Sequence, residues 1–333
     1  MSWTSIVETY KKKGVVLCLG AGVSVGSNLP NWPDLLQRLA DGCGDATLDV
    51  AALVRLGWTL PAIAGMLART YGSRDDFAKA VRRALYQDFP FFPQGVTKEN
   101  RRAFVRHVRE QNSSLSAVAA LCACRLDSGR YAPNPLIHGI VTFNLDVLLQ
   151  AYVYSRYEKR LLRTVERAAA GRLPGKIPVY HMHGNLRFDS KAGDPSKEGA
   201  DVLVLGEHDY FDFFNDPLSL FNYTFMYLLR EYICLFIGFS MTDTNARRLL
   251  HYSRKERIKA RVAEGCELSK AEAKALRHFA VLERPAENQF RQHWEDSLKA
   301  LGVTPLWLAN YSELTDKLGA LYCSTGSVWQ DVY

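Results

Sequence analysis

The sequence predicts an α/β fold, a Rossmann-like, doubly wound and mostly parallel sheet with an inserted helical lobe. Short apolar runs typical of buried strands alternate with helical patterns, and such alternation requires crossover connections between parallel strands. One long stretch, from Pro33 to Tyr131, contains helical patterns but no convincing strand run. We therefore expect a main domain of residues 1–32 and 133–333, and an inserted helical lobe of residues 33–132.

Apolar runs of strand length define the expected sheet. The first, Val15 to Leu19, follows three lysines, but it stops at Gly20 without a cleavage site of small residues. We interpret it as a buried strand and not as part of a signal peptide. The other expected strands are Leu136 to Thr142, Pro178 to Met182, Val202 to Leu205, Tyr232 to Ile237, His278 to Leu282 and Thr304 to Leu308. Expected helices in the insert include Asp34 to Ala40, Asp49 to Ala68 and Phe77 to Tyr86, and the charged residues Asp189 to Asp201 predict an exposed connection.

Composition limits the class of protein. A chain of 333 residues with 47% hydrophobic content can bury a large core, which excludes a disordered protein. No apolar run reaches the roughly 20 residues that a membrane-spanning helix needs. The 7 cysteines are odd in number and several lie in apolar runs, which favours a reducing cytoplasm. The net charge of +7 is compatible with an anionic partner such as a dinucleotide or a nucleic acid.

Short polar or glycine-rich motifs close several of the apolar runs. In open α/β sheets, ligands bind outside the carboxyl ends of the strands, so these motifs predict one shared crevice. The motifs are Gly20-Ala21-Gly22-Val23-Ser24, Thr142-Phe143-Asn144-Leu145-Asp146, His183-Gly184 and Gly238-Phe239-Ser240.

The first motif has two interpretations. Glycines directly after a strand allow a tight turn whose N–H groups approach a phosphate, and Ser24 can add a hydroxyl donor. A simple tight turn is the alternative. The usual dinucleotide fingerprint would place a third glycine at position 25, where this chain has Val25. The loop is therefore not that of a standard dehydrogenase.

The second and third motifs contain groups that can bind or transfer protons. Asn144 and Asp146 can act on a ligand or simply cap a helix, and Asp243 has the same two interpretations. His181 and His183 are two residues apart in an expected strand, which predicts side chains on one face. Such a pair can bind a metal if carboxylates such as Asp146 and Asp243 join it, or His183 can accept a proton near neutral pH. We expect no metal and a structural role for His181.

In their order along the chain, these motifs resemble those of the sirtuin family, whose members bind NAD. The resemblance covers about residues 14 to 245 and implies that NAD is the substrate, with His183 as general base. It further implies that Asn144 positions the nicotinamide ribose or an attacking water, and that Asp146 receives the nicotinamide carboxamide. The residues that it implies for NAD binding are Gly20, Ala21, Gly22, Ser24, Pro30, Trp32, Thr142, Gly238, Ser240 and Asp243.

The chain departs from the deacetylase sirtuins in several places. Phe143 replaces a glutamine, and the segment Pro30 to Pro33 lacks the arginine of the deacetylase motif. No C-x-x-C pair occurs, so the zinc ribbon that helps deacetylases to grip a peptide is missing and water is the expected acceptor. The segment from Gly238 to Asn245 is similar to the bacterial branch of anti-phage defence proteins. This branch implies a cytoplasmic NAD hydrolase that depletes NAD in abortive infection.

Three other functions are compatible with the same residues. A protein deacylase or ADP-ribosyltransferase would use the same NAD site, a non-enzymatic sensor would bind NAD or ADP-ribose without turnover, and a metal-dependent hydrolase would use His181 and His183. The resemblance implies a homo-oligomer and an activating partner, such as an ATPase of the HerA type or an Argonaute-like protein. The basic segment Arg247 to Arg261 is a solvated helix face, an anion-binding surface that could take nucleic acid, or a partner surface.

Overall fold

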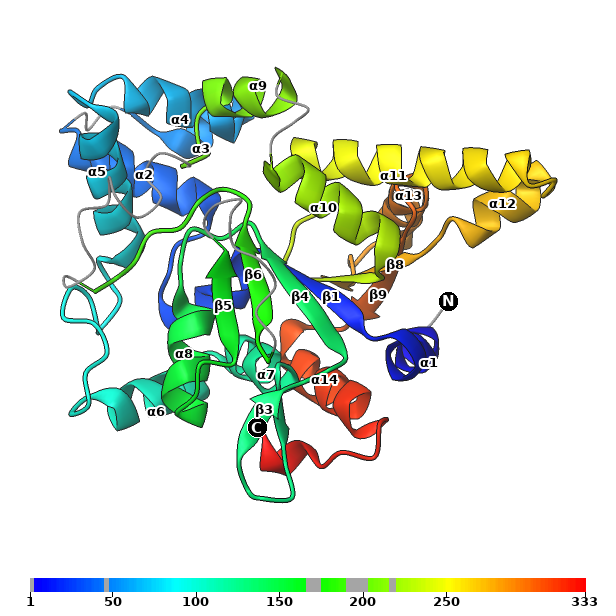
Figure 1. Cartoon of the computed structure of the whole chain (residues 1–333). Coiled ribbons are helices and arrows are strands. Elements are labelled where there is room, and N and C mark those ends of the chain that lie inside the picture. The colour runs from blue at the N-terminus through cyan, green and yellow to red at the C-terminus, as the bar shows by residue number, and fades with distance from the viewer. Residues whose placement is uncertain (1–2, 45–47, 166–174, 190–202, 216–219) are drawn as a thin grey trace.

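A seven-stranded parallel sheet forms the centre of the protein (Figure 1). The structure is a computed structural model that describes residues 3–44, 48–165, 175–189, 203–215 and 220–333. Every neighbouring pair of strands in the sheet is parallel, which confirms the predicted α/β fold class. In the order β5-β6-β4-β1-β7-β8-β9, the strands are β5 (Leu162–Val165), β6 (Ile177–His181), β4 (Ile137–Thr142), β1 (Val15–Leu19), β7 (Cys234–Ile237), β8 (His278–Glu283) and β9 (Val303–Leu308).

The order of the strands reverses direction beside β1. The chain passes from β1 to β4 on one side and later reaches β7 on the other side of β1. In the register, Leu19 pairs with Thr142 and with Ile237, so β1, β4 and β7 end at the same edge of the sheet. Such a reversal leaves a crevice at the carboxyl ends of the strands, where ligands bind in open α/β sheets.

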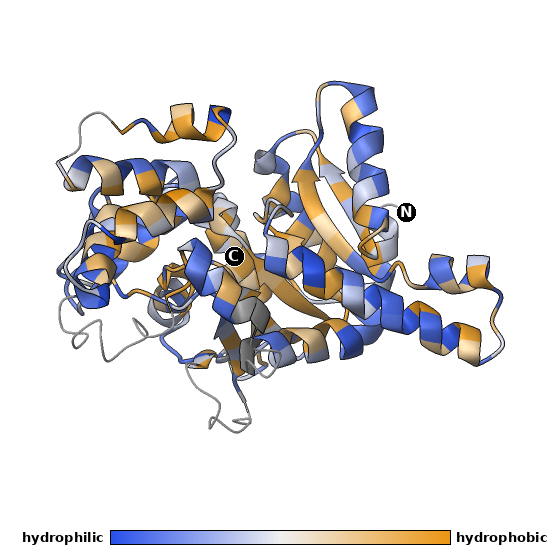
Figure 2. Cartoon of the chain, turned by 90° about the horizontal axis from the view of Figure 1, so that it is seen from above, coloured by the Kyte–Doolittle hydropathy of each residue, from blue (hydrophilic) through white to orange (hydrophobic). Residues whose placement is uncertain are grey.

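Helices cover both faces of the sheet, as a doubly wound fold requires. All five residues of β1 are buried, and successive ones belong to different cores. Leu17 packs in the core formed with α1, α7, α8 and α14, whereas Val16 packs in the core formed with α10, α11 and α13. Figure 2 shows the hydrophobic strands enclosed between these helical layers.

The helices vary widely in length. None of the described ones is long and apolar enough to cross a membrane. They are α1 (Trp3–Lys13), α2 (Trp32–Gly42), α3 (Val50–Arg55), α4 (Leu60–Ala68), α5 (Arg74–Tyr86), α6 (Arg101–Gln111), α7 (Ser113–Leu121), α8 (Leu148–Tyr157), α9 (Glu207–Asn215), α10 (Leu220–Glu231), α11 (Thr244–Ala263), α12 (Leu268–Lys274), α13 (Asn288–Lys299) and α14 (Leu314–Cys323).

The helices α2, α4, α5 and α9 gather beside the carboxyl edge of the sheet (Figure 1). Helix α2 begins at Trp32 because the Asn31 side chain accepts a hydrogen bond from the backbone N–H of Asp34, and Pro33 suits the first turn. Helices α6 and α7, which follow in the chain, pack instead against α8, and α7 also packs against α14. The segment between β1 and β4 therefore contributes both to the group beside the cavity and to the layer over the sheet.

One predicted helix is two helices in the structure. The expected helix from Asp49 to Ala68 is broken between α3 and α4, where Gly57 has a φ of 93° that a continuous helix does not allow. Thr59 then caps α4 by accepting a hydrogen bond from the backbone N–H of Ala62, and Pro61 lies in the first turn. These local signals outweigh the helical spacing of the apolar residues.

The predicted set of strands differs from the structure at several positions. Leu203–Leu205 is not a strand, because its backbone meets His183 and the Asp209 side chain instead of a neighbouring strand. Val202 and the expected connection lie outside the described residues, apart from Asp189. The prediction missed β5, a short edge strand that contains polar residues. It also missed the hairpin of β2 (Ala123–Arg125) and β3 (Tyr131–Pro133), because these strands are too short to show a clear pattern.

Candidate functional site

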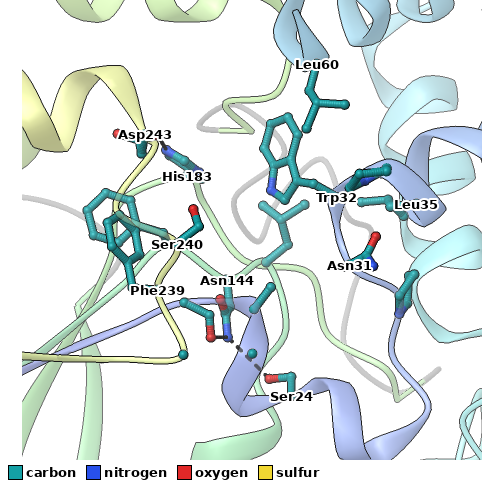
Figure 3. Close-up of a pocket in the computed structure, with 18 of the residues that line it drawn as sticks. Ser24, Asn31, Trp32, Leu35, Leu60, Asn144, His183, Phe239, Ser240 and Asp243 are labelled. Carbon is teal, nitrogen blue, oxygen red and sulfur yellow. Dashed lines mark hydrogen bonds and ion pairs between the residues drawn. The ribbon is translucent and has the colours of Figure 1, made fainter. Parts of the chain in front are cut away.

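A cavity of about 680 Å³ lies at the carboxyl edge of the sheet, where β1, β4 and β7 end. Its volume is within the range of small-molecule sites. The strand-end motifs form one side, and residues of α2 and α4 such as Trp32, Leu35 and Leu60 face them from the other side (Figure 3). All the predicted site residues except Thr142 line the cavity, namely Gly20, Ala21, Gly22, Ser24, Pro30, Trp32, Asn144, Asp146, His183, Gly238, Ser240 and Asp243.

The glycines at the ends of β1 and β7 pack directly against each other. The N–H of Gly20 donates to the carbonyl of Ile237, and the N–H of Gly22 donates to the carbonyl of Gly238. A Cβ on Gly20 would lie 2.5 Å from the Gly238 oxygen, closer than any side chain tolerates. The N–H groups of Gly20 and Gly22 therefore donate hydrogen bonds within the protein. Glycine is needed here because the backbones of two loops lie in contact. The sequence predicts a different reason, namely the close approach of a phosphate.

Asn144 is held in one orientation by the first loop. Its side-chain nitrogen donates to the Gly20 carbonyl at 3.1 Å and to the Ser24 hydroxyl at 3.3 Å. Its backbone N–H donates to the Thr142 hydroxyl, so Thr142 supports Asn144 from outside the main cavity. The Asn144 Oδ1 is buried and has no hydrogen-bond partner among the described residues. Because buried acceptors are normally satisfied, this oxygen is suited to accept a hydrogen bond from a ligand or water.

Asp146 is a buried carboxylate beside Asn144. Burial raises its pKa, and hydrogen bonds from the Ser24 hydroxyl and the Leu148 backbone N–H oppose this effect. The bond from Leu148 is 3.0 Å long and helps to begin α8, so the side chain both satisfies a helix start and lines the cavity. The two interpretations of Asp146 are therefore compatible.

The two histidines of the His181-Met182-His183 segment have different environments. Strand β6 ends at His181, so the expectation that both side chains leave one face of a strand is wrong. The His181 ring contacts the Gln150 side chain at 2.7 Å and the Asn144 carbonyl at 3.2 Å, contacts that are consistent with the expected structural role. Burial lowers the pKa of His181 to about 4. The chain turns after His181, and His183 lines the cavity.

His183 lies among aromatic rings and beside one carboxylate. It is 5% exposed, and its ring makes edge contacts with Trp32, Phe143 and Tyr210. Its Nε2 atom is 3.5 Å from Asp243 Oδ2, a contact drawn in Figure 3. Burial lowers the pKa of His183, and the Asp243 charge acts in the opposite direction. The ring is therefore neutral at pH 7, and Asp243 can stabilise it once it accepts a proton.

Sequence reasoning missed Tyr210, a residue of α9 that reaches the cavity. Its hydroxyl donates to Asp243 Oδ2 at 3.0 Å and lies 3.5 Å from His183 Nε2. No motif marks this tyrosine, because its place depends on the packing of α9 against α4. Leu35 and Leu60, which form an apolar wall of the cavity with Trp32, were also missed, because no local signal marks them.

The described residues contain no group of three or more His, Cys, Asp or Glu side chains that could hold a metal ion. The carboxylates considered as further ligands, Asp146 and Asp243, do not join both histidines: Asp146 binds the start of α8, and Asp243 meets only His183. The groups that the cavity does present are an imidazole, a partnerless amide oxygen and buried carboxylates. Together they can orient a polar ligand and accept a proton.

Comparison with known protein families agrees with the resemblance seen in the sequence. Residues 138–306 match the family described as the SIR2-like domain, and no curated protein matches the chain. The match runs from β4 into β9 and includes Asn144, His183 and Asp243, whereas the glycine loop precedes it. SIR2-like domains use NAD, which fits an NAD-dependent enzyme. Since the matched segment covers half of the chain and carries Asn144, His183 and Asp243 of the cavity, this protein belongs to the SIR2-like family.

Proposed function

We propose that this protein hydrolyses NAD to nicotinamide and ADP-ribose. The observation that carries the proposal is the arrangement of His183 and Asn144 in one cavity. His183 is a buried, neutral imidazole next to a carboxylate, and the Asn144 Oδ1 is an acceptor that has no partner in the described parts of the chain. A base and an oriented acceptor at one cavity are the groups that delivery of a water molecule requires.

The chemistry asks little of the protein beyond positioning. Nicotinamide leaves NAD as a neutral molecule, so no acid needs to protonate it. In this proposal Asn144 Oδ1 accepts a hydrogen bond from the ribose or from the attacking water, and Asp146 accepts one from the carboxamide. His183 takes a proton from that water. The apolar wall of Trp32, Leu35 and Leu60 excludes other water from the reacting atoms.

Water is the acceptor that the chain favours. The sequence has no C-x-x-C pair from which a deacetylase zinc ribbon could be built. By its similarity to the anti-phage branch, we further propose that the protein depletes NAD during abortive infection, in the cytoplasm and as a homo-oligomer. An uncontrolled NAD hydrolase would harm its own cell, so the proposal includes an activating partner.

The test is the release of nicotinamide from NAD by the purified protein, alone and with lysate of phage-infected cells that contains its genomic neighbours, followed by chromatography with and without a chelator. We expect release that the chelator does not change and that falls about 100-fold or more in His183→Ala and Asn144→Ala. His251→Ala is the matched control, because this histidine is exposed on α11. Its release should equal that of the wild type.

Each rival function gives a different result in the same assay. Inhibition by the chelator would favour a metal-dependent hydrolase, and release that requires an acylated peptide would favour a deacylase. ADP-ribose attached to protein would identify a transferase. Binding of NAD by calorimetry without any release, also in lysate of phage-infected cells that contains its genomic neighbours, would overturn the hydrolase in favour of a sensor.

A further inference from the structure

Three polar groups from distant parts of the chain meet at the cavity. Asp243 Oδ2 lies 3.0 Å from the Tyr210 hydroxyl and 3.5 Å from His183 Nε2, and the Tyr210 hydroxyl is also 3.5 Å from His183 Nε2. All three side chains are largely shielded from solvent. The group is formed by the turn after β6, by α9 and by the start of α11.

The Asp243 carboxylate is fixed by the helix that follows it. Asp243 is the N-cap of α11, and its Oδ1 accepts a hydrogen bond of 2.7 Å from the backbone N–H of Ala246. The helix start stabilises negative charge at this place. Because Oδ1 is used by the cap, Oδ2 remains for Tyr210 and His183. Helix capping alone therefore explains the contacts of only one of the two Asp243 carboxylate oxygens.

Helix α9 is anchored by Asp209, the residue before Tyr210. Asp209 Oδ2 accepts hydrogen bonds from the backbone N–H groups of Leu205 and Gly206. Asp209 Oδ1 pairs with Arg74 at the start of α5, at 3.1 Å. Helix α9 also packs against α4. These contacts fix Tyr210 at Asp243 and connect its position to the helices that form the far wall of the cavity.

We propose that Asp243 and Tyr210 are positioning residues for His183. Asp243 orients the ring and stabilises its positive charge when it is protonated. Tyr210 weakens this effect, because its hydroxyl group binds the same carboxylate. Only the catalytic use of His183 rests on the proposed function; the three-residue arrangement does not. When His183 accepts a proton, both ring nitrogens carry hydrogen and the N–H at Nε2 faces Asp243. The proton stays on the His183 ring.

The contact distances suit a site that tightens when a ligand binds. A separation of 3.5 Å between His183 Nε2 and Asp243 Oδ2 is longer than a strong hydrogen bond between charged groups. Hydrogen bonds of catalytic groups are often long without ligand and shorten in the complex. The Tyr210 hydroxyl donates a hydrogen bond of 3.0 Å to the same oxygen, so Asp243 Oδ2 is shared between Tyr210 and His183.

The arrangement predicts opposite effects of two conservative substitutions on the pKa of His183. The charged or titratable groups that face this ring are Asp243 and Tyr210, with Asp209 acting from farther along α9. Asp243→Asn removes the negative charge and should lower the His183 pKa further. Tyr210→Phe frees Asp243 Oδ2 for the histidine and should raise it. Asparagine is also a good N-cap, so Asp243→Asn preserves α11.

The experiment is a histidine titration by NMR with ¹³C-labelled histidine, in which His183→Gln assigns the signal. It compares the full-length wild type, Asp243→Asn, Tyr210→Phe and the control Tyr227→Phe, an exposed tyrosine of α10. We expect the His183 pKa to fall in Asp243→Asn, to rise in Tyr210→Phe and to stay unchanged in the control. Shifts in the same direction for both variants, or no shift in either, would overturn the proposal.

Activity provides an independent second measurement. A base acts only when unprotonated, so the acid limb of nicotinamide release should move to lower pH in Asp243→Asn and to higher pH in Tyr210→Phe. The maximal rate of Asp243→Asn should also fall about tenfold or more, because the protonated ring loses its partner. Opposite pKa shifts without any nicotinamide release, also in lysate of phage-infected cells, would support the arrangement and refute the hydrolase. Release with an acid limb at the same pH in all variants would refute the positioning role.

Discussion

At the scale of single residues, Gly20 and Gly238 are among the positions most tightly constrained by tertiary contacts. A Cβ on Gly20 would meet the Gly238 oxygen at 2.5 Å and the Phe239 Cα at 2.6 Å. Gly238 has a φ of 62°, and a Cβ there would lie 2.5 Å from the Val23 nitrogen. The neighbours are backbone atoms, which cannot move aside as a side chain can. The contact therefore fixes the two strand ends that form the floor of the cavity.

Gly20→Ala should accordingly destabilise the protein by about 1–3 kcal/mol, because overpacking forces the backbone of both loops to shift. Gly42→Ala is the matched control. Among the described residues, no atom lies within 4 Å of the Cβ that Gly42 would gain, and alanine suits the end of α2. The free energy of unfolding, measured in urea, should fall in the first variant and stay equal or rise in the second. Equal values for both variants would contradict the close contact.

At the scale of elements, Asn112 connects the start of one helix to the glycine loop. Its Oδ1 caps α7 by accepting a hydrogen bond from the backbone N–H of Leu115. Its side-chain nitrogen donates to the Val23 carbonyl and to the Ser27 hydroxyl, both at 2.9 Å. Asn112 is almost fully buried. It therefore joins the loop after β1 to the start of α7, a helix that packs against one face of the sheet.

Replacing Asn112 by alanine removes a cap and leaves two buried groups without a donor. We expect Asn112→Ala to lower the free energy of unfolding by about 2–4 kcal/mol. Asn31→Ala should cost only about 1 kcal/mol, because Asn31 is exposed and, within the described parts of the chain, its side chain bonds only to the start of α2. Denaturation of the two variants in parallel isolates the contribution of the loop contact. Similar losses in both would show that Asn112 acts as a cap alone.

The basic segment Arg247 to Arg261 lies within α11, and the structure divides it into two sets. Arg247 donates to the Met241 carbonyl and to the Ser297 hydroxyl, and Arg257 donates to the Leu229 carbonyl at the end of α10. These side chains hold α11 against its neighbours. Lys255 and Lys259 are exposed, so they belong to the solvated face that the sequence analysis considered.

At the scale of the whole molecule, buried histidines connect stability to pH. Burial lowers the pKa of His181 to about 4, and it lowers the pKa values of His183 and His278 as well. Below about pH 6.5 these histidines are protonated in the unfolded chain but stay neutral in the folded protein. The free energy of unfolding therefore decreases as the pH falls towards the pKa values of the folded state. Asp146, whose pKa is raised by burial, acts in the opposite sense at more acidic pH.

Stability should therefore fall between pH 7 and pH 5, and His181 alone should account for about 2 kcal/mol of the loss. His181→Gln removes this titration, so its free energy of unfolding should change less over the same range. The comparison is urea denaturation at both pH values, with the exposed His251→Gln as control. A wild-type protein equally stable at pH 7 and pH 5 would contradict the buried, neutral state of these rings.

The sequence by itself determined the class of the sheet and the residues at its carboxyl edge. The runs ending at Leu19, Thr142 and Ile237 were predictable because strand patterns and glycine turns are local properties of a chain. Parallel strands then bring their carboxyl ends to one edge, so Gly20, Asn144 and Gly238 had to lie near each other.

Only the tertiary structure decided how these residues work together. The separation of His181 from His183 depends on where β6 ends, and the contact of Tyr210 with Asp243 depends on the packing of α9 against α4. No periodicity encodes these events, because they arise between segments that are far apart in the sequence. The partners of a catalytic side chain are set by packing between elements, whereas the elements themselves follow from their local sequences.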